Sequence, residues 1–147
     1  MKKRKTVLFI CTHNSARSQI AEALLNSKYG DKFSAVSAGT KPTKISPYAI
    51  RVMAEAGLDV SGSRSKNVSE FKDKKFEYLI TVCDNAKESC PYFPDAAKVI
   101  HAGFANPSEF QGSDRETMEN FRVLRDLISD WLDKFASGRK EHENNKL

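Results

Sequence analysis

Three residues that could act together in catalysis fall within one short segment: a cysteine at position 11, an arginine at 17 and a serine at 18. The uninterrupted apolar run of residues 7–10 precedes the cysteine, and a helical pattern follows from Gln19. A buried strand, a short loop and a helix start direct successive backbone N–H groups into a concavity at the positive end of the helix dipole. Such a concavity binds an oxyanion.

The side chains of this segment suit the same purpose. The planar guanidinium of Arg17 matches two oxygens of a tetrahedral anion. Nearby positive charge and a helix N-terminus favour the thiolate form of Cys11, which is the reactive form of a cysteine. The alternative is a buried structural cysteine beside a surface arginine, but reactive cysteines typically lie at such a strand-to-helix turn. The segment therefore predicts an oxyanion site with a nucleophile in its floor.

Two further cysteines, Cys83 and Cys90, need an explanation that a single nucleophile does not supply. Zinc is one option, although zinc pairs are usually closer in sequence, and the second pair would have to come from His13 or His101. In a second option, Cys83 is a small core residue and Cys90 an exposed spectator. The third is a thiol relay, in which Cys83 approaches Cys11 in one state and Cys90 in another, because bonded cysteines need close Cα atoms.

The pattern of apolar residues predicts which elements position these cysteines. Strands are predicted at residues 7–10, 33–38, 76–82 and 98–101, and helices at 18–29, at 46–57 and after the capping residue Ser113, with Leu127 on the apolar face of the last helix. Strands that alternate with helices imply a parallel sheet covered on both faces. Active sites in such sheets lie beyond the carboxyl ends of the strands. Cys11, Cys83 and the loop with Asn106 are therefore expected at one rim.

Length and composition fit one soluble α/β domain. The 147 residues are 39% hydrophobic and 29% charged, so we expect a single domain over residues 1–138, with a four-stranded parallel sheet and helices on both faces. Residues 139–147 are expected to form a polar, disordered tail. The formal net charge of +5 comes from scattered lysines, which favours small anions over nucleic acid as partners.

The same composition bears on location. No apolar stretch is long enough for a membrane span or a secretory signal, so the cytoplasm is the expected compartment and no membrane partner is expected. Three cysteines is an odd number, which argues for thiol chemistry or a metal rather than a secreted disulfide framework. We expect a monomer.

The segment Cys-Thr-His-Asn-Ser-Ala-Arg-Ser-Gln at residues 11–19 resembles the phosphate-binding loop of the low-molecular-weight protein tyrosine phosphatase family. Within that family it is most similar to the branch of thioredoxin-coupled arsenate reductases, which carry two more cysteines in a segment Val-Cys-Asp-x-Ala…Cys-Pro. Residues 82–91 match that segment through Cys83 and Cys90. Ordinary tyrosine phosphatases of this fold lack the late pair. The resemblance covers residues 5 to about 137, and it favours the relay.

The resemblance implies a mechanism for reducing arsenate, a phosphate analogue, with phosphate and sulfate as competitors. Arsenate would be held by the Arg17 side chain and by the N–H groups of the loop residues Thr12, His13, Asn14, Ser15, Ala16 and Arg17. Cys11 attacks arsenic, and Cys83 then attacks the Cys11 sulfur, so that arsenite leaves with two electrons. Cys90 attacks Cys83, and thioredoxin reduces the resulting disulfide. No metal or other cofactor is implied.

Two loop side chains have supporting roles in this picture. Ser18 is implied by the resemblance to donate a hydrogen bond that steadies the Cys11 thiolate. Asn14 is expected to hold the shape of the loop through side-chain hydrogen bonds, the alternative being an exposed turn residue.

The late loop departs from the family pattern. The family's general acid is an aspartate before a proline, where this chain has Asn106-Pro107. An asparagine cannot give up a proton, so phosphate-ester hydrolysis is expected to lose about a hundredfold or more in rate, while arsenate reduction survives. Glu109 or Asp114 could substitute, although each is better explained as a surface or helix-start carboxylate.

The family also suggests a cation site. Some members hold potassium beneath the loop through groups that match Asn14, Glu22 and Ser37, together with an aspartate whose position corresponds to Lys66. Because the Lys66 ammonium could replace the ion, no potassium is predicted. Composition alone instead places Lys66 in a solvated loop at residues 59–66.

Two other functions are weighed against arsenate reduction. A low-molecular-weight phosphatase would hydrolyse phosphotyrosine or small phosphomonoesters through a Cys11 phosphocysteine, using Cys11 and Arg17 alone. The substitution at Asn106 also suggests a non-catalytic module that binds anions or senses redox state. The expected function is thioredoxin-dependent arsenate reduction.

Overall fold

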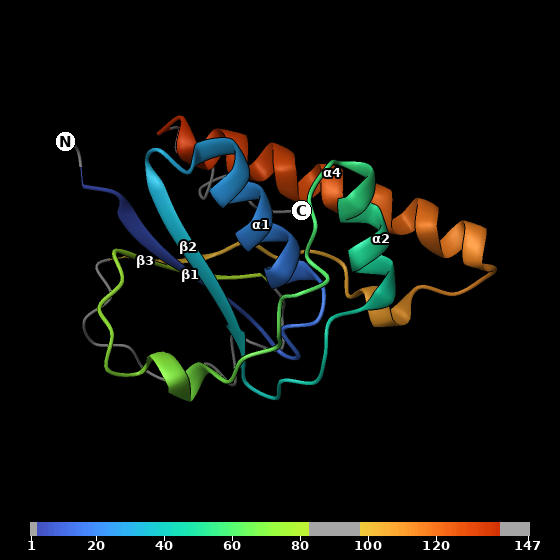
Figure 1. Ribbon diagram of the computed structural model, residues 1–147, viewed down its shortest axis with the longest axis horizontal. Coiled ribbons are helices and arrows are strands. Elements are labelled where there is room, and N and C mark those ends of the chain that lie inside the picture. The colour runs from blue at the N-terminus through green and yellow to red at the C-terminus, as the bar shows by residue number, and fades with distance from the viewer. Residues whose placement is uncertain (1–2, 83–97, 139–147) are drawn as a thin grey trace.

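A computed structural model describes residues 3–82 and 98–138 of the chain (Figure 1). The strands are β1 (Lys5–Cys11), β2 (Phe33–Gly39), β3 (Tyr78–Thr81) and β4 (Lys98–His101), the helices are α1 (Arg17–Tyr29), α2 (Pro47–Glu55) and α4 (Asp114–Ala136), and two short 3₁₀ helices are η1 (Val68–Phe71) and η2 (Pro107–Glu109). Cys83, Cys90 and the expected tail at residues 139–147 lie outside the described residues.

The four strands form one parallel sheet in the order β2-β1-β3-β4. The inner strand β1 pairs with β2 along its whole length, so that Cys11 lies opposite Gly39. On its other side, Ile10 lies opposite Thr81 of β3. The apolar run of β1 is fully buried, as expected for a parallel strand covered on both faces. This register carries Cys11 to the carboxyl edge of the sheet.

The helices begin at the signals expected from the sequence, with one exception. Ser46 caps α2 ahead of Pro47, and Ser113 caps α4 in a reciprocal arrangement with Glu116. Helix α1 starts at Arg17 directly from the loop after β1, without a side-chain cap. Because the first N–H groups of a helix have no partner within it, those of α1 are left for another acceptor.

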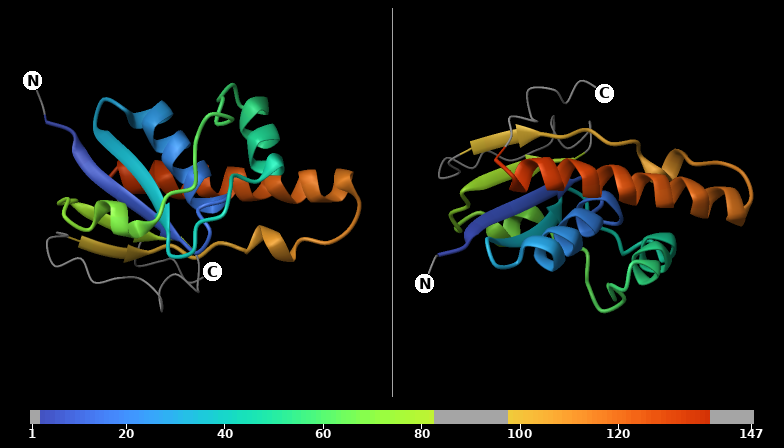
Figure 2. Two further views of the ribbon diagram at one scale, coloured as in Figure 1. Left: turned by 60° about the horizontal axis from the view of Figure 1, so that its bottom comes forward. Right: turned by 90° about the horizontal axis from the view of Figure 1, so that it is seen from above.

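The layers pack through aromatic residues. Helices α1 and α4 lie side by side on one side of the sheet, α2 packs against α4, and η1 lies on the opposite side (Figures 1 and 2). On α4, the rings of Trp131 and Phe135 stack with their centroids 5.5 Å apart. Phe135 also meets Phe33 of β2 and Tyr78 of β3. These contacts fix the carboxyl end of α4 against the sheet.

The single-domain fold with a four-stranded parallel sheet is confirmed. Two predictions about single residues are wrong. Leu127 is 50% exposed, because the inward stripe of α4 is filled by Leu124 and Ile128 instead. Lys66 is not solvated: its side chain is only 14% exposed, because it turns toward Glu22 of α1.

Candidate active site

The loop that follows Cys11 is held from outside by its carbonyl groups. The carbonyls of Cys11, Thr12, His13 and Ser15 accept hydrogen bonds from backbone N–H groups within residues 40–46, at 2.8 to 3.2 Å. The C=O and N–H of one trans peptide point in opposite directions. Because these carbonyls face outward, the N–H groups of residues 12, 13, 14 and 16 face the inside of the loop. The result is a cup lined by amide donors.

Gly39 lets β2 approach this loop closely. A Cβ at that position would lie 2.5 Å from the carbonyl oxygen of Thr12 and 2.9 Å from the amide nitrogen of Asn14. Both neighbours are backbone atoms of the cup, so neither can move aside without deforming it. The end of β2 therefore needs a residue without a side chain.

Cys11 lies in the floor of the cup and is 2% exposed. The N–H of Asn14 donates to Cys11 Sγ at 3.2 Å, and Ser18 Oγ lies 2.9 Å from the same sulfur. Hydrogen bonds donated to sulfur stabilise the thiolate more than the thiol. The N-terminus of α1 adds its dipole in the same sense.

Asn14 fixes the direction of the hydrogen bonds around the cysteine. It is fully buried and has a φ of 51°, in the left-handed region that asparagine tolerates better than most residues. Its Oδ1 accepts from the backbone N–H of Lys66 at 2.9 Å and from Gln19 Nε2 at 3.0 Å, which settles the orientation of the amide. The two protons on Nδ2 then go to Ser18 Oγ at 2.7 Å and Ser37 Oγ at 2.9 Å.

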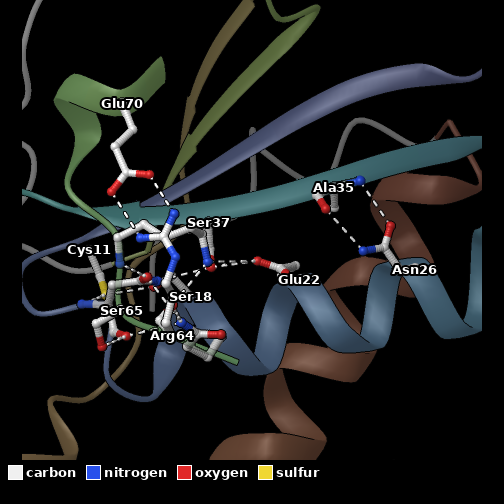
Figure 3. Close-up of polar contacts among 12 residues, drawn as sticks. Cys11, Ser18, Glu22, Asn26, Ala35, Ser37, Arg64, Ser65 and Glu70 are labelled. Atoms are coloured by element: carbon white, nitrogen blue, oxygen red, sulfur yellow. Dashed lines mark hydrogen bonds and ion pairs between the residues drawn. The ribbon is translucent and has the colours of Figure 1, made fainter. Parts of the chain in front are cut away.

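The hydrogen bond from Asn14 to Ser18 sets the direction in which the Ser18 hydroxyl donates. Because Ser18 Oγ accepts from Asn14, its own proton is available for Cys11 Sγ, and a thiolate can only accept. Figure 3 shows Cys11, Ser18 and Ser37 gathered beneath the loop. The geometry thus makes Ser18 a donor to the thiolate.

Arg17 ties the cup to the late loop of the chain. Its Nη1 donates to the carbonyl oxygen of Phe104 at 3.2 Å, and the residue is mostly buried. Between these two loops lies a cavity of about 360 Å³ that contains both Cys11 and Asn106. The cavity is lined by Cys11, His13, Ser15, Ala16, Arg17, Ser46, Tyr48, Asn106, Pro107, Phe110, Thr117 and Phe121. The structure therefore brings Cys11, Arg17 and Asn106 to one site.

The chain segment that leads from β3 to Cys83 begins beside β1. The N–H of Val82 donates to the carbonyl oxygen of Ile10 at 2.9 Å, one residue before Cys11. Val82 is also the residue before Cys83, which lies outside the described residues together with Cys90.

The two carboxylates weighed as substitutes for a general acid lie outside the cavity lining. Asp114 pairs with Arg51 of α2 at 3.0 Å. Hydrogen bonds from Arg51 and from Tyr48 lower the pKa of Asp114, so it is held as an anion rather than as a proton donor. Glu109 is exposed at the end of η2. Asn106 is therefore the late-loop residue at the expected general-acid position that lines the same cavity as Cys11.

No group of three or more His, Cys, Asp or Glu side chains that could hold a metal ion occurs within residues 3–82 and 98–138. Of the histidines weighed as zinc ligands, His13 lines the cavity, and His101 Nδ1 lies 2.7 Å from Thr81 Oγ1. The cysteine pair of the zinc alternative lies outside the described residues.

Several residues that shape the site did not stand out in the sequence. Gln19 donates to the carbonyls of Asn14 and Arg64, and the Ser65 hydroxyl donates to the carbonyl of Asn14. Tyr48 and Phe110 form part of the cavity wall. A signal existed for Gln19: it is a polar residue next to the apolar stripe of α1.

Known proteins resemble this chain in both sequence and structure. The family model described as low molecular weight phosphotyrosine protein phosphatase matches residues 6–145. An arsenate reductase from Halalkalibacterium halodurans is 34% identical over 137 residues, which are 93% of this chain and 99% of that protein. A solved arsenate reductase in an intermediate state has a TM-score of 0.74 at 25% identity, over 91% of this chain and 98% of that one. A thioredoxin-dependent arsenate reductase from Corynebacterium glutamicum has a TM-score of 0.64 at 26% identity, over 94% of this chain and 65% of that one.

Proposed function

The chain belongs to the low molecular weight phosphotyrosine protein phosphatase family, and we propose that it reduces arsenate to arsenite with electrons from thioredoxin. The observation that carries this proposal is the position of Val82, the residue before Cys83 in the sequence, whose N–H donates to the carbonyl oxygen of Ile10 next to Cys11. A second thiol able to reach Cys11 is what a reductase needs and a phosphatase does not.

Arsenate binding uses the cup and Arg17. A tetrahedral oxyanion in the cup accepts hydrogen bonds from the inward N–H groups of the loop, while the guanidinium of Arg17 engages two of its oxygens. Phosphate and sulfate compete because they have the same shape and charge sign. The Cys11 thiolate lies beneath the central atom, in line for attack.

The redox step passes through three sulfurs. Cys11 forms a bond to arsenic, and one arsenate oxygen leaves as hydroxide, which becomes water with a proton from the solvent. The Cys83 thiolate then attacks Cys11, so that a sulfur–sulfur bond forms, the sulfur–arsenic bond breaks, and its electron pair stays on arsenic, which leaves as arsenite. Cys90 attacks Cys83 and releases the Cys11 thiolate. The dithiol of thioredoxin reduces the Cys83–Cys90 disulfide.

Asn106 affects arsenate reduction and phosphate-ester hydrolysis differently. Its amide donates hydrogen bonds to an oxyanion but gives up no proton. An arsenate oxygen that is already protonated leaves as hydroxide without that help, whereas the alkoxide of a phosphate ester needs a proton from the enzyme. The residue therefore favours arsenate reduction over ester hydrolysis.

A phosphatase is the second candidate, and the cavity wall favours it. The rings of Tyr48 and Phe121 stack with centroids 5.4 Å apart, and Phe110 meets Phe121 edge-on at 5.5 Å. Such an aromatic wall suits the ring of an aryl phosphate. We propose weak hydrolysis of aryl phosphates as a side activity of Cys11 and Arg17.

The proposed cellular location rests on the chemistry of the thiol relay. No helix in the described part of the chain is long and apolar enough to cross a membrane. A relay of thiols that thioredoxin must reduce belongs in a reducing compartment. We therefore propose a cytoplasmic monomer that uses neither a metal nor an organic cofactor.

The proposal is tested by arsenate turnover with thioredoxin, thioredoxin reductase and NADPH, followed as NADPH consumption and as arsenite released. We expect steady turnover that requires all three components, one arsenite for each NADPH, and inhibition by phosphate. NADPH consumption without arsenite, or no turnover by a chain that still hydrolyses p-nitrophenyl phosphate, would leave the phosphatase as the function.

A further inference from the structure

Lys66 is fixed directly behind the cup. Its backbone N–H donates to Asn14 Oδ1 at 2.9 Å, and its carbonyl oxygen accepts from the N–H of Gly39 at 2.8 Å. Its ammonium lies 3.8 Å from Glu22 Oε1 and donates to the carbonyl oxygen of Arg64 at 3.1 Å. The backbone of Lys66 is thus fixed to the cup and to β2, and its ammonium lies near two oxygen atoms.

Glu22 connects this ammonium to the cup. Glu22 Oε1 accepts the proton of Ser37 Oγ at 2.7 Å (Figure 3). Ser37 Oγ in turn accepts from Asn14 Nδ2, whose other proton goes to Ser18. A continuous set of hydrogen bonds therefore connects Glu22 to the serine that donates to Cys11, with Asn14 as the donor to both serines.

The Ser37 hydroxyl donates to Glu22, so this end of the set needs the carboxylate as an acceptor. The Glu22 side chain is only 23% exposed, and a largely buried carboxylate needs a positive partner. Without one, its charge would oppose the thiolate and the bound oxyanion. Lys66 supplies that partner.

A potassium ion does not fit this arrangement. The family places such an ion among groups that match Asn14, Glu22 and Ser37, but here the Lys66 ammonium lies 3.8 Å from Glu22 Oε1 and already supplies the positive charge that an ion would bring. We propose that Lys66 is a built-in monovalent cation, a positioning residue that keeps the cup ready for an oxyanion without added potassium. This inference concerns the reactivity of Cys11 and holds whichever oxyanion the site uses.

The test follows alkylation of Cys11 by iodoacetamide at pH 7 in a chain whose Cys83 and Cys90 are serine, so that Cys11 is the sole thiol. Rates are compared in potassium chloride and choline chloride at equal ionic strength. The parent is expected to react at the same rate in both salts. Lys66→Ala is expected to react about fivefold or more slowly in choline, because the thiolate is less stabilised, and to recover in potassium, which enters the vacated space.

Two variants distinguish this role from a general effect of charge or folding. Lys75→Ala removes an exposed lysine and is expected to match the parent in both salts. Lys66→Ala combined with Glu22→Gln is expected to lose the response to potassium, because the carboxylate that attracts the ion is gone. Melting temperatures in the two salts give a second readout: potassium should raise that of Lys66→Ala and not that of the parent.

The inference is overturned by any of three results. The first is a parent whose alkylation rate or melting temperature requires potassium. The second is a Lys66→Ala chain that matches Lys75→Ala in choline. The third is a loss in Lys66→Ala that potassium does not restore. None of these readouts involves arsenate, so the inference and the proposed function fail separately.

Discussion

Replacing Cys83 with serine is expected to abolish thioredoxin-dependent release of arsenite. A serine hydroxyl cannot form a disulfide with Cys11, so the sulfur–arsenic bond has no partner to take its sulfur, and no electron pair returns to arsenic. Hydrolysis of p-nitrophenyl phosphate needs only Cys11 and Arg17 and should stay within about twofold of the parent. Both rates are measured on the same preparation.

Cys90→Ser is the matched control for this prediction. It retains Cys11 and Cys83, so it is expected to release one arsenite per chain and then stop, holding a Cys11–Cys83 disulfide that mass spectrometry detects. A Cys83→Ser chain that continues to release arsenite with thioredoxin would contradict the relay.

Replacing Asn106 with aspartate is expected to raise hydrolysis of p-nitrophenyl phosphate by about a hundredfold. Asn106 lies in the same cavity as Cys11, and an aspartic acid of the same size can protonate the leaving oxygen. Arsenate turnover should change much less, since its leaving oxygen carries a proton already. The measurement is kcat for both reactions across pH, and the variant should lose hydrolysis at high pH as the aspartate ionises.

The nearby carboxylates provide the control. Glu109→Gln is expected to leave hydrolysis unchanged, because Glu109 lies outside the cavity lining. Asp114→Asn should also leave hydrolysis intact while weakening the contact between α2 and α4 that Arg51 makes. Equal hydrolysis by the parent and Asn106→Asp would show that this position does not hold the proton donor.

The sequence was sufficient for the framework of the site. The apolar run before Cys11 and the helical pattern after it are local signals, and the alternation of elements implied a parallel sheet with its functional edge at Cys11 and Asn106. The parallel sheet and the place of Cys11 at its carboxyl edge are confirmed, because each prediction rests on the spacing of a few neighbouring residues.

The contacts of the residues behind the cup could not be predicted in the same way. The contact between Lys66 and Asn14 joins residues 52 positions apart, and it depends on the register that sets Cys11 against Gly39. The demand for glycine at that position likewise appears only when β2 meets the backbone of the loop. Composition therefore wrongly predicts that Lys66 is a loop residue in solvent, whereas its correspondence to a family cation ligand indicates the right place.

Among the residues behind the cup, Asn14 is the one on which the reactivity of Cys11 is expected to depend most. Asn14→Ala removes the two amide protons that bond Ser18 and Ser37 and the oxygen that accepts from the backbone N–H of Lys66. Cys11 should therefore react more slowly with iodoacetamide. Asn26 offers a matched control, because its amide bonds Ala35 of β2 away from the cup (Figure 3). Asn26→Ala should lower stability without slowing Cys11.

The most direct measurement is the rate at which iodoacetamide alkylates Cys11 at pH 6, in the chain with serine at positions 83 and 90, with and without phosphate. A thiolate held in an amide-lined cup should react about tenfold or more faster than an ordinary thiol at this pH, and phosphate should protect it. Alkylation at the rate of an ordinary thiol, unaffected by phosphate, would contradict the account.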